Sequence, residues 1–342
     1  MALESLPVEL TLRISDLLSL QCSFYFALTS RKLAAILLPR ARIITLSYAA
    51  HQGKRDLFLR VLEEDVDFSV TLGDQTILEE VILNRKDDYA ISLLDRGVGL
   101  VSPPGSICSG AGVTLLHLAA AAGCDNAVSK RLLVHGDDVD PFVMDDEGLT
   151  SLICAVNKGN LPAVKLLVDI YYEKGKEIDP RDSRYPLLLQ AAQQGHEEVI
   201  LFLLQTKGVR VNARGPDGEN ALHWMNQTGI ERDENEDDYN ESGMEITNIQ
   251  ALIAAGVSVS DMATEDRLTP LHSAARHGRW NFIPHLVSGG ADMAARCSLG
   301  GTPLHWAAHG GSGRTIDTLV DLGASVNDTD SDGKTPLLWA HN

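Results

Sequence analysis

The sequence predicts an all-α solenoid of about eight helix-pair units and a partial ninth, preceded by a small three-helix head. The strongest observation is a motif with a constant period: Thr269, Thr302 and Thr335 each begin Thr-Pro-Leu, and successive copies lie 33 residues apart. The second is composition, because 44% of the residues are hydrophobic and only 5% are aromatic. That balance suits many thin layers of Leu, Ala and Val better than one large aromatic core.

Each repeat has the local signals of two helices. A threonine before proline supplies an N-cap followed by the residue favoured at the first helical position. Two alanines then allow close approach of a neighbouring helix, and a glycine nine residues after the cap is expected to end the helix in the left-handed conformation. A second helix with a Leu-Leu or Leu-Val pair follows. Weaker copies begin at Thr114, Thr150, Pro186 and Asn220, and two degenerate ones begin near Ile44 and Thr76.

These motifs resemble the ankyrin-repeat family, whose pattern is Thr-Pro-Leu-His, then Ala-Ala, a glycine, a second helix and a Gly-Ala turn. The resemblance covers residues 42–342, in clear form over 112–342 and in degenerate form over 42–101. It implies L-shaped stacks of antiparallel helix pairs, with turn tips projecting to one side and first helices lining a concave groove. Ankyrin proteins usually bind their partners in that groove and on those tips.

The groove prediction concerns positions seven and eight after each cap, which follow the alanine pair and differ in chemistry from repeat to repeat. The alternative is that they are solvated helix ends. An aromatic column four positions after the cap is expected to pack between repeats, with a ligand-stacking stripe as the alternative. The predicted groove residues from these positions are Asn157, Lys158, Gln193, Gln194, Trp224, Arg276, His277, Trp306 and His309.

A histidine column lies one position before the aromatic column. It comprises His117, His223, His272 and His305. The family resemblance implies that each of these imidazoles bonds to backbone and links adjacent turns. We therefore expect a structural role for the column and assign it no catalytic one.

Two irregularities interrupt the repeats. The unit from Asn220 to Gly256 is 15 residues longer than its neighbours, and the excess includes the acidic run 231–241 within an insertion over 230–245. We expect a mobile acidic loop, either a tolerated insertion or a docking site for a basic partner. Pro284 falls inside a second helix and is expected to kink it.

Residues 1–41 do not follow the repeat and predict three short helices. Leu6, Leu10, Ile14 and Leu17 have the spacing of an amphipathic helix. Thr29 and Ser30 can cap another helix that begins at Arg31 and is ended by Pro39.

The head also resembles the F-box family, through Leu6-Pro7-Val8-Glu9-Leu10 and the later segment Ala27-Leu28-Thr29-Ser30-Arg31-Lys32-Leu33. That family implies docking onto a Skp-type adaptor of a cullin–RING ubiquitin ligase, with Leu6, Pro7, Leu10, Ile14 and Leu17 at the adaptor. The third segment departs from the family, because it lacks the usual late aromatic residue. The alternative is a helical cap that seals the first repeat. An F-box followed by ankyrin repeats is similar to many filamentous-fungal proteins.

Charge and cysteine usage exclude several classes of function. The formal net charge is −18, and residues 1–45 carry a net +2, so the repeats hold the negative charge and disfavour nucleic acid and anionic lipid as partners. Five scattered cysteines without a Cys-x-x-Cys pair indicate free thiols in a reducing compartment. With no signal peptide and no long apolar run, we expect a cytoplasmic or nuclear location and no membrane partner.

Motifs for chemistry are incomplete in this sequence. Gly195-His196-Glu197 resembles the start of a metalloprotease motif, but Ile200 stands where its second histidine would be. We therefore expect no catalytic residue, metal or cofactor. The predicted function is substrate recognition for a ubiquitin ligase, with the groove binding the target protein. The alternatives are a plain ankyrin scaffold and an unusual enzyme that holds a small molecule in the groove.

Overall fold

The computed structural model describes residues 31–64, 66–72, 74–98, 108, 112–135, 139–179, 184–225 and 243–340. Within these ranges every regular element is a helix, and the only ladder contacts are two isolated antiparallel bridges, Leu72–Gln75 and Met144–Thr150. The predicted all-α fold is confirmed. The adaptor-facing candidates and the acidic run lie outside the described residues: Leu6, Pro7, Leu10, Ile14, Leu17 and 231–241.

The chain divides into two compact units, residues 1–167 and 168–342. In the first unit the described helices are α3 (Arg31–His51), α4 (Arg55–Leu62), α5 (Ile77–Leu83), α6 (Asp87–Asp95), α8 (Leu115–Ala122), α9 (Asn126–His135) and α10 (Ser151–Lys158). Helix α11 (Leu161–Glu173) runs across the boundary.

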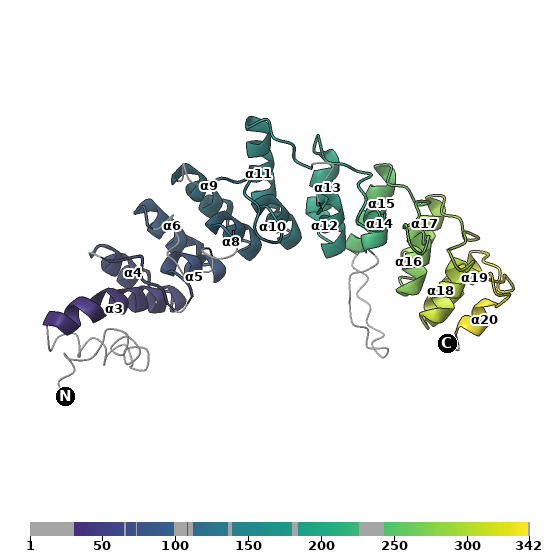
Figure 1. Cartoon of the computed structure of the whole chain (residues 1–342), viewed down its shortest axis with the longest axis horizontal. Coiled ribbons are helices and arrows are strands. Elements are labelled where there is room, and N and C mark those ends of the chain that lie inside the picture. Colours follow the sequence, from purple (N-terminus) through teal and green to yellow (C-terminus); the bar gives the residue numbers. More distant parts are fainter. Residues whose placement is uncertain are drawn as a thin grey trace. The chain divides into compact units, whose positions relative to one another are not determined.

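The second unit contains α12 (Leu187–Gln194), α13 (Glu197–Gln205), α14 (Ala221–Trp224), α15 (Gly243–Ala254), α16 (Pro270–Arg276), α17 (Ile283–Ser288), α18 (Pro303–His309), α19 (Gly313–Asp321) and α20 (Pro336–Trp339). In chain order the described helices thus make eight pairs and a final single helix, as the repeat pattern predicts (Figure 1).

Helices of the same rank stack on one another within each unit. The first helix of a repeat contacts the first helix of the next repeat, as in the pairs α8–α10 and α16–α18 (Figure 1). The second helices contact one another in the same way, as in the pair α6–α9. The alanine pair lies at this contact, and Ala274 and Ala275 have no exposed surface. Small side chains there allow the close approach that thin repeat layers need.

Glycine ends the first helices as predicted. The residue nine positions after the cap has a positive φ between 65° and 76° at Gly123, Gly159, Gly195, Gly278 and Gly311. Only glycine enters this left-handed region without a steric cost.

Two predictions that rested on proline were wrong. Helix α3 continues through Pro39 to His51, because Ile43, Leu46 and Ala49 downstream are fully buried and hold the helix together. Pro284 does not kink a helix, since α17 begins at Ile283 and places the proline in its first turn. Its missing N–H costs nothing there, because first-turn N–H groups have no intrahelical partner.

The degenerate repeat at Thr76 keeps the fold with different residues. Glu79 takes the histidine position and is fully buried. Its Oε2 accepts a hydrogen bond from the Thr76 N–H at 2.7 Å, and its Oε1 accepts one from the Cys108 N–H at 3.3 Å. Arg85 occupies the glycine position with a φ of 54°. The repeat geometry is therefore conserved even where the motif is lost.

No described helix combines the length and the apolar character needed to cross a membrane.

Candidate functional site

The histidine column links four of the described repeats to the repeat that follows. The Nδ1 atom accepts a hydrogen bond from the backbone N–H of its own cap residue, so the proton lies on Nε2, which donates to a turn carbonyl in the following repeat. For His272 that carbonyl is Gly301, at 3.2 Å. The equivalent distances are 3.0 Å for His117–Leu149, 3.0 Å for His223–Leu268 and 3.1 Å for His305–Lys334. The predicted structural role is confirmed.

Burial disfavours the charged form of three of these imidazoles, those of His223, His272 and His305. Desolvation lowers the pKa of His272 from its ordinary value to about 4, although hydrogen bonds to backbone act in the opposite direction. Desolvation likewise lowers the pKa of His223 and of His305. Both ring nitrogens of each of these histidines are occupied by structural bonds, so the column holds the turns in register and leaves recognition to other residues.

An aromatic and cationic cluster is built by the first helices of the last three repeats, α16, α18 and α20. Trp306 of α18 and Trp339 of α20 pack edge to face with ring centroids 5.4 Å apart, and His309 lies 5.9 Å from Trp306 and 6.3 Å from Trp339. The Arg276 guanidinium, from the end of α16, lies 5.2 Å from the Trp306 ring centroid. A cation over the face of tryptophan is attracted to its negative quadrupole.

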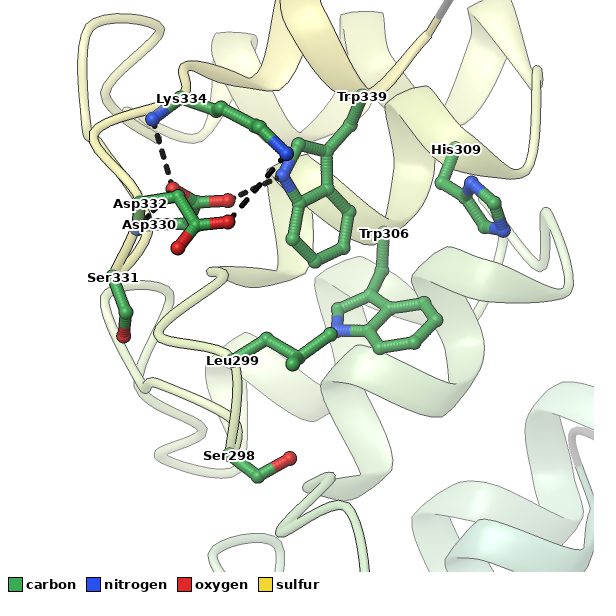
Figure 2. A pocket seen from close by; sticks show the side chains of 9 residues that line it. All are labelled: Ser298, Leu299, Trp306, His309, Asp330, Ser331, Asp332, Lys334 and Trp339. Carbon is green, nitrogen blue, oxygen red and sulfur yellow. Dashed lines mark hydrogen bonds and ion pairs between the residues drawn. The ribbon is translucent and has the colours of Figure 1, made fainter. Parts of the chain in front are cut away.

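A cavity of about 370 Å³ opens beside this cluster (Figure 2). Helices α18 and α20 supply its rings, and the turns that precede them supply its polar groups. Its lining residues are Ser298, Leu299, Trp306, His309, Asp330, Ser331, Asp332, Lys334 and Trp339.

Asp330 fixes the shape of the cavity wall. Its Oδ1 accepts hydrogen bonds from the N–H groups of Asp332 and Lys334, and its Oδ2 accepts one from Trp339 Nε1 at 2.7 Å (Figure 2). Burial acts to raise the pKa of Asp330, but these hydrogen bonds outweigh it and lower the pKa below its ordinary value. The carboxylate thus ties the α20 tryptophan to the turn.

A smaller hollow of about 150 Å³ lies between α14 and α16. Arg276 and His277 line it from the end of α16, and His223 lines it from α14. Its acidic lining residues are Asp217, Glu219, Glu265 and Asp266. In each of these two hollows the carboxylates outnumber the lysine and arginine side chains.

The predicted groove residues divide into two sets. Arg276, Trp306 and His309 come together in the cluster, and Arg276 and His277 both line the smaller hollow. The remainder line neither hollow. They lie at the ends of α10 and α12 and in α14: Asn157, Lys158, Gln193, Gln194 and Trp224.

Sequence reasoning missed the turn residues of the larger cavity. Leu299, Asp332 and Lys334 lie in the segments just before a cap, and these segments project beside the first helices. The Asp330-Ser331-Asp332-Gly333 run is a turn signal, and its position directly before Thr335 is the clue that could have placed it at the groove. Within the described ranges, no three His, Cys, Asp or Glu side chains gather to hold a metal ion.

Comparison with known proteins identifies the repeats. A family model described as ankyrin repeats (3 copies) matches residues 46–182 and 271–342, more than half of the chain. The B-cell lymphoma 3 protein homolog of Mus musculus is 35% identical over 123 residues, which are 35% of this chain and 26% of that protein. The chain therefore spans about a quarter of that relative's length.

A solved structure gives the same fold. The crystal structure of the human ASB11 ankyrin repeat domain matches 71% of this chain and 96% of that domain, with a TM-score of 0.55 and 23% sequence identity. At this identity the match supports the stacked helix-pair architecture.

Proposed function

Because the chain belongs to the ankyrin-repeat family, whose repeats are protein–protein interaction modules, we propose that it is a substrate receptor of a ubiquitin ligase. In this proposal the repeats bind a target protein, and the N-terminal segment attaches the receptor to a Skp-type adaptor of a cullin–RING ligase. In this proposal the receptor acts in the cytoplasm or nucleus, because free thiols such as those of Cys124 and Cys297 are typical of reducing compartments.

The observation that carries target binding is the cluster of Arg276, Trp306, His309 and Trp339 beside an open cavity. Tryptophan and arginine dominate the energetically important positions of protein interfaces, because they offer large contact areas together with hydrogen-bond donors. The carboxylates at the cavity rim add the polar border that is typical of such interfaces.

Adaptor binding is supported by the sequence of the head. Leu6-Pro7-Val8-Glu9-Leu10 resembles the F-box start, and in this proposal the leucine stripe of the head stays exposed, as clustered leucines at a binding surface do. The test is a pull-down of the full chain with a purified Skp-type adaptor. We expect the wild-type chain to bind and the double variant Leu6→Ala/Leu10→Ala to lose binding with an almost unchanged melting temperature.

Leu322→Ala is the matched control, because Leu322 is an exposed leucine of the last complete repeat and its loss should leave adaptor binding intact. If the head is only a cap for the first repeat, the wild-type chain will not bind the adaptor. Each head substitution will then lower the free energy of unfolding by about 2–5 kcal/mol, as truncation of a buried leucine does. That pair of results would leave a plain ankyrin scaffold as the function.

A further inference from the structure

The wall of the larger cavity contains a hydrogen-bond donor without an acceptor among the described residues. Trp306 is 8% exposed, and its Nε1 atom is fully enclosed without a hydrogen-bond partner among the described residues. A buried donor of this kind is costly unless another group satisfies it. In Figure 2 the nitrogen edge of the Trp306 ring faces the Leu299 side of the cavity. A ligand that carries a carbonyl oxygen would supply the missing acceptor.

The charges around the cavity favour a cationic ligand. Asp330 and Asp332 line it together with one lysine, Lys334, and the imidazole of His309, and the neighbouring hollow has four carboxylates and one arginine. Asp332 is exposed, and its ion pair with Lys334, at 3.5 Å, is a surface contact that a ligand can exchange. The ring faces suit the same ligand, since Trp306 already holds the Arg276 guanidinium over one face.

We propose that this cavity receives an arginine or lysine side chain from an extended segment of the target protein, an inference that rests on the protein-binding function proposed above. The cation lies over the Trp339 ring and pairs with Asp332. A backbone carbonyl of the same segment accepts a hydrogen bond from Trp306 Nε1. Because that atom is enclosed, a lining side chain has to move, and Leu299, which is 57% exposed, can do so.

The smaller hollow sets the position of a second basic residue. It lies between α14 and α16, whereas the larger cavity lies between α18 and α20, so two helix-to-helix steps separate them. Packed helices are roughly 8–10 Å apart, which places the hollows roughly 16–20 Å apart. An extended chain advances about 3.3 Å per residue and alternates the faces of its side chains, so the segment needs basic side chains about six residues apart.

Three short fluorescent peptides test this proposal on the full chain by fluorescence anisotropy. All share a Gly-Ser-Thr backbone, and two positions at the inferred spacing carry arginine, its neutral isostere citrulline, or glutamate. We expect the arginine peptide to bind about tenfold more tightly than the citrulline peptide and to weaken at high salt, because pairing with carboxylates is screened by salt. Equal binding of all three, preference for glutamate, or no binding of any would overturn the proposal.

Variants locate the binding. Asp332→Asn should weaken the arginine peptide about fivefold, whereas Asp321→Asn, an equal charge change on an exposed residue of α19 outside the cavity, should leave its affinity unchanged. Trp306→Phe keeps an aromatic ring but removes the donor, and should weaken the arginine and citrulline peptides alike by about three- to tenfold. Thermal melts of each variant establish that it is folded. Equal effects of the two aspartate variants would contradict the proposal.

The peptide test is independent of the adaptor test. If the chain binds the arginine peptide but not the adaptor, the basic-segment site is supported and the ligase role is rejected. If it binds the adaptor but not the peptide, the ligase role is supported and the basic-segment site is rejected.

Discussion

The repeat at Thr76 and the repeats at Thr269 and Thr302 reach the same geometry by opposite chemistry. His272 donates from Nε2 to the Gly301 carbonyl, whereas Glu79 accepts from the Cys108 N–H. In both repeats the side chain also accepts the N–H of its own cap residue, three positions earlier. A link of this kind therefore needs a buried polar side chain that satisfies its own cap and reaches the next repeat. The next repeat must present the matching donor or acceptor.

Placing each of the two side chains at the other position should destabilise both repeats, and this is the largest loss of stability that we predict. His272→Glu places a buried carboxylate against the Gly301 carbonyl and should cost about 3–5 kcal/mol of the free energy of unfolding. Glu79→His places an imidazole N–H against the Cys108 N–H and should cost about 1–3 kcal/mol. Urea denaturation followed by circular dichroism measures both.

His272→Gln is the control for the first exchange, because a glutamine keeps one acceptor and one donor at this position. If His272→Glu were no more destabilising than His272→Gln, the polarity of the link would not matter.

The second prediction concerns how closely the repeats approach. Position eight after the cap is Asn84 in the repeat at Thr76 and Gly310 in the repeat at Thr302. A Cβ on Gly310 would lie 2.5 Å from the Arg276 carbonyl oxygen, so Gly310→Ala forces a backbone shift. We expect a loss of about 2–3 kcal/mol, in the upper part of the usual range for overpacking.

Gly313→Ala is the matched control for this substitution. Nothing lies within 4 Å of its Cβ position, and Gly313 is the first residue of α19. The change should therefore stabilise the chain by about 0.5–1 kcal/mol through helix propensity. A stability gain in both variants would show that α16 and α18 tolerate a wider spacing.

The third prediction uses pH to separate the two kinds of link. The pKa of His272 is about 4 in the folded chain and about 6.5 in an unfolded one, so the unfolded state binds more protons between these values. The stability of the histidine link is therefore complete above pH 6.5 and decreases as the pH falls toward 4. At about pH 5 the expected loss from this group is roughly 2 kcal/mol.

The matched measurement uses His272→Gln, which has no titrating group at this position. Its stability should fall less than that of the wild-type chain between about pH 7 and about pH 5, by the amount assigned to His272. An identical pH dependence in both proteins would place the titration elsewhere.

Predictability from sequence differs between these regions for physical reasons. Caps, glycine positions and the histidine link were predictable, because each depends on residues at a fixed spacing in the repeat. The predicted helix end at Pro39 was wrong, because the burial of Ile43 and Leu46 in the continued helix outweighs the one backbone hydrogen bond that proline cannot donate. The larger cavity was not predictable, because its wall depends on the bond between Trp339 and Asp330, which needs three-dimensional turn geometry.

The smallest predicted effect concerns Arg85, which occupies the position that glycine holds in the regular repeats. Its φ is 54°, and a side chain in this left-handed region costs about 1–2 kcal/mol. Glycine removes that strain but loses more entropy on folding, so Arg85→Gly should stabilise the chain by only about 0.5–1 kcal/mol. Lys86→Gly removes the same charge at the next residue, where φ is −91°, and should give no gain. Differential scanning calorimetry compares the two variants. An equal shift of the melting temperature in both variants would mean that removal of the positive charge, and not relief of the backbone strain at Arg85, changes the stability.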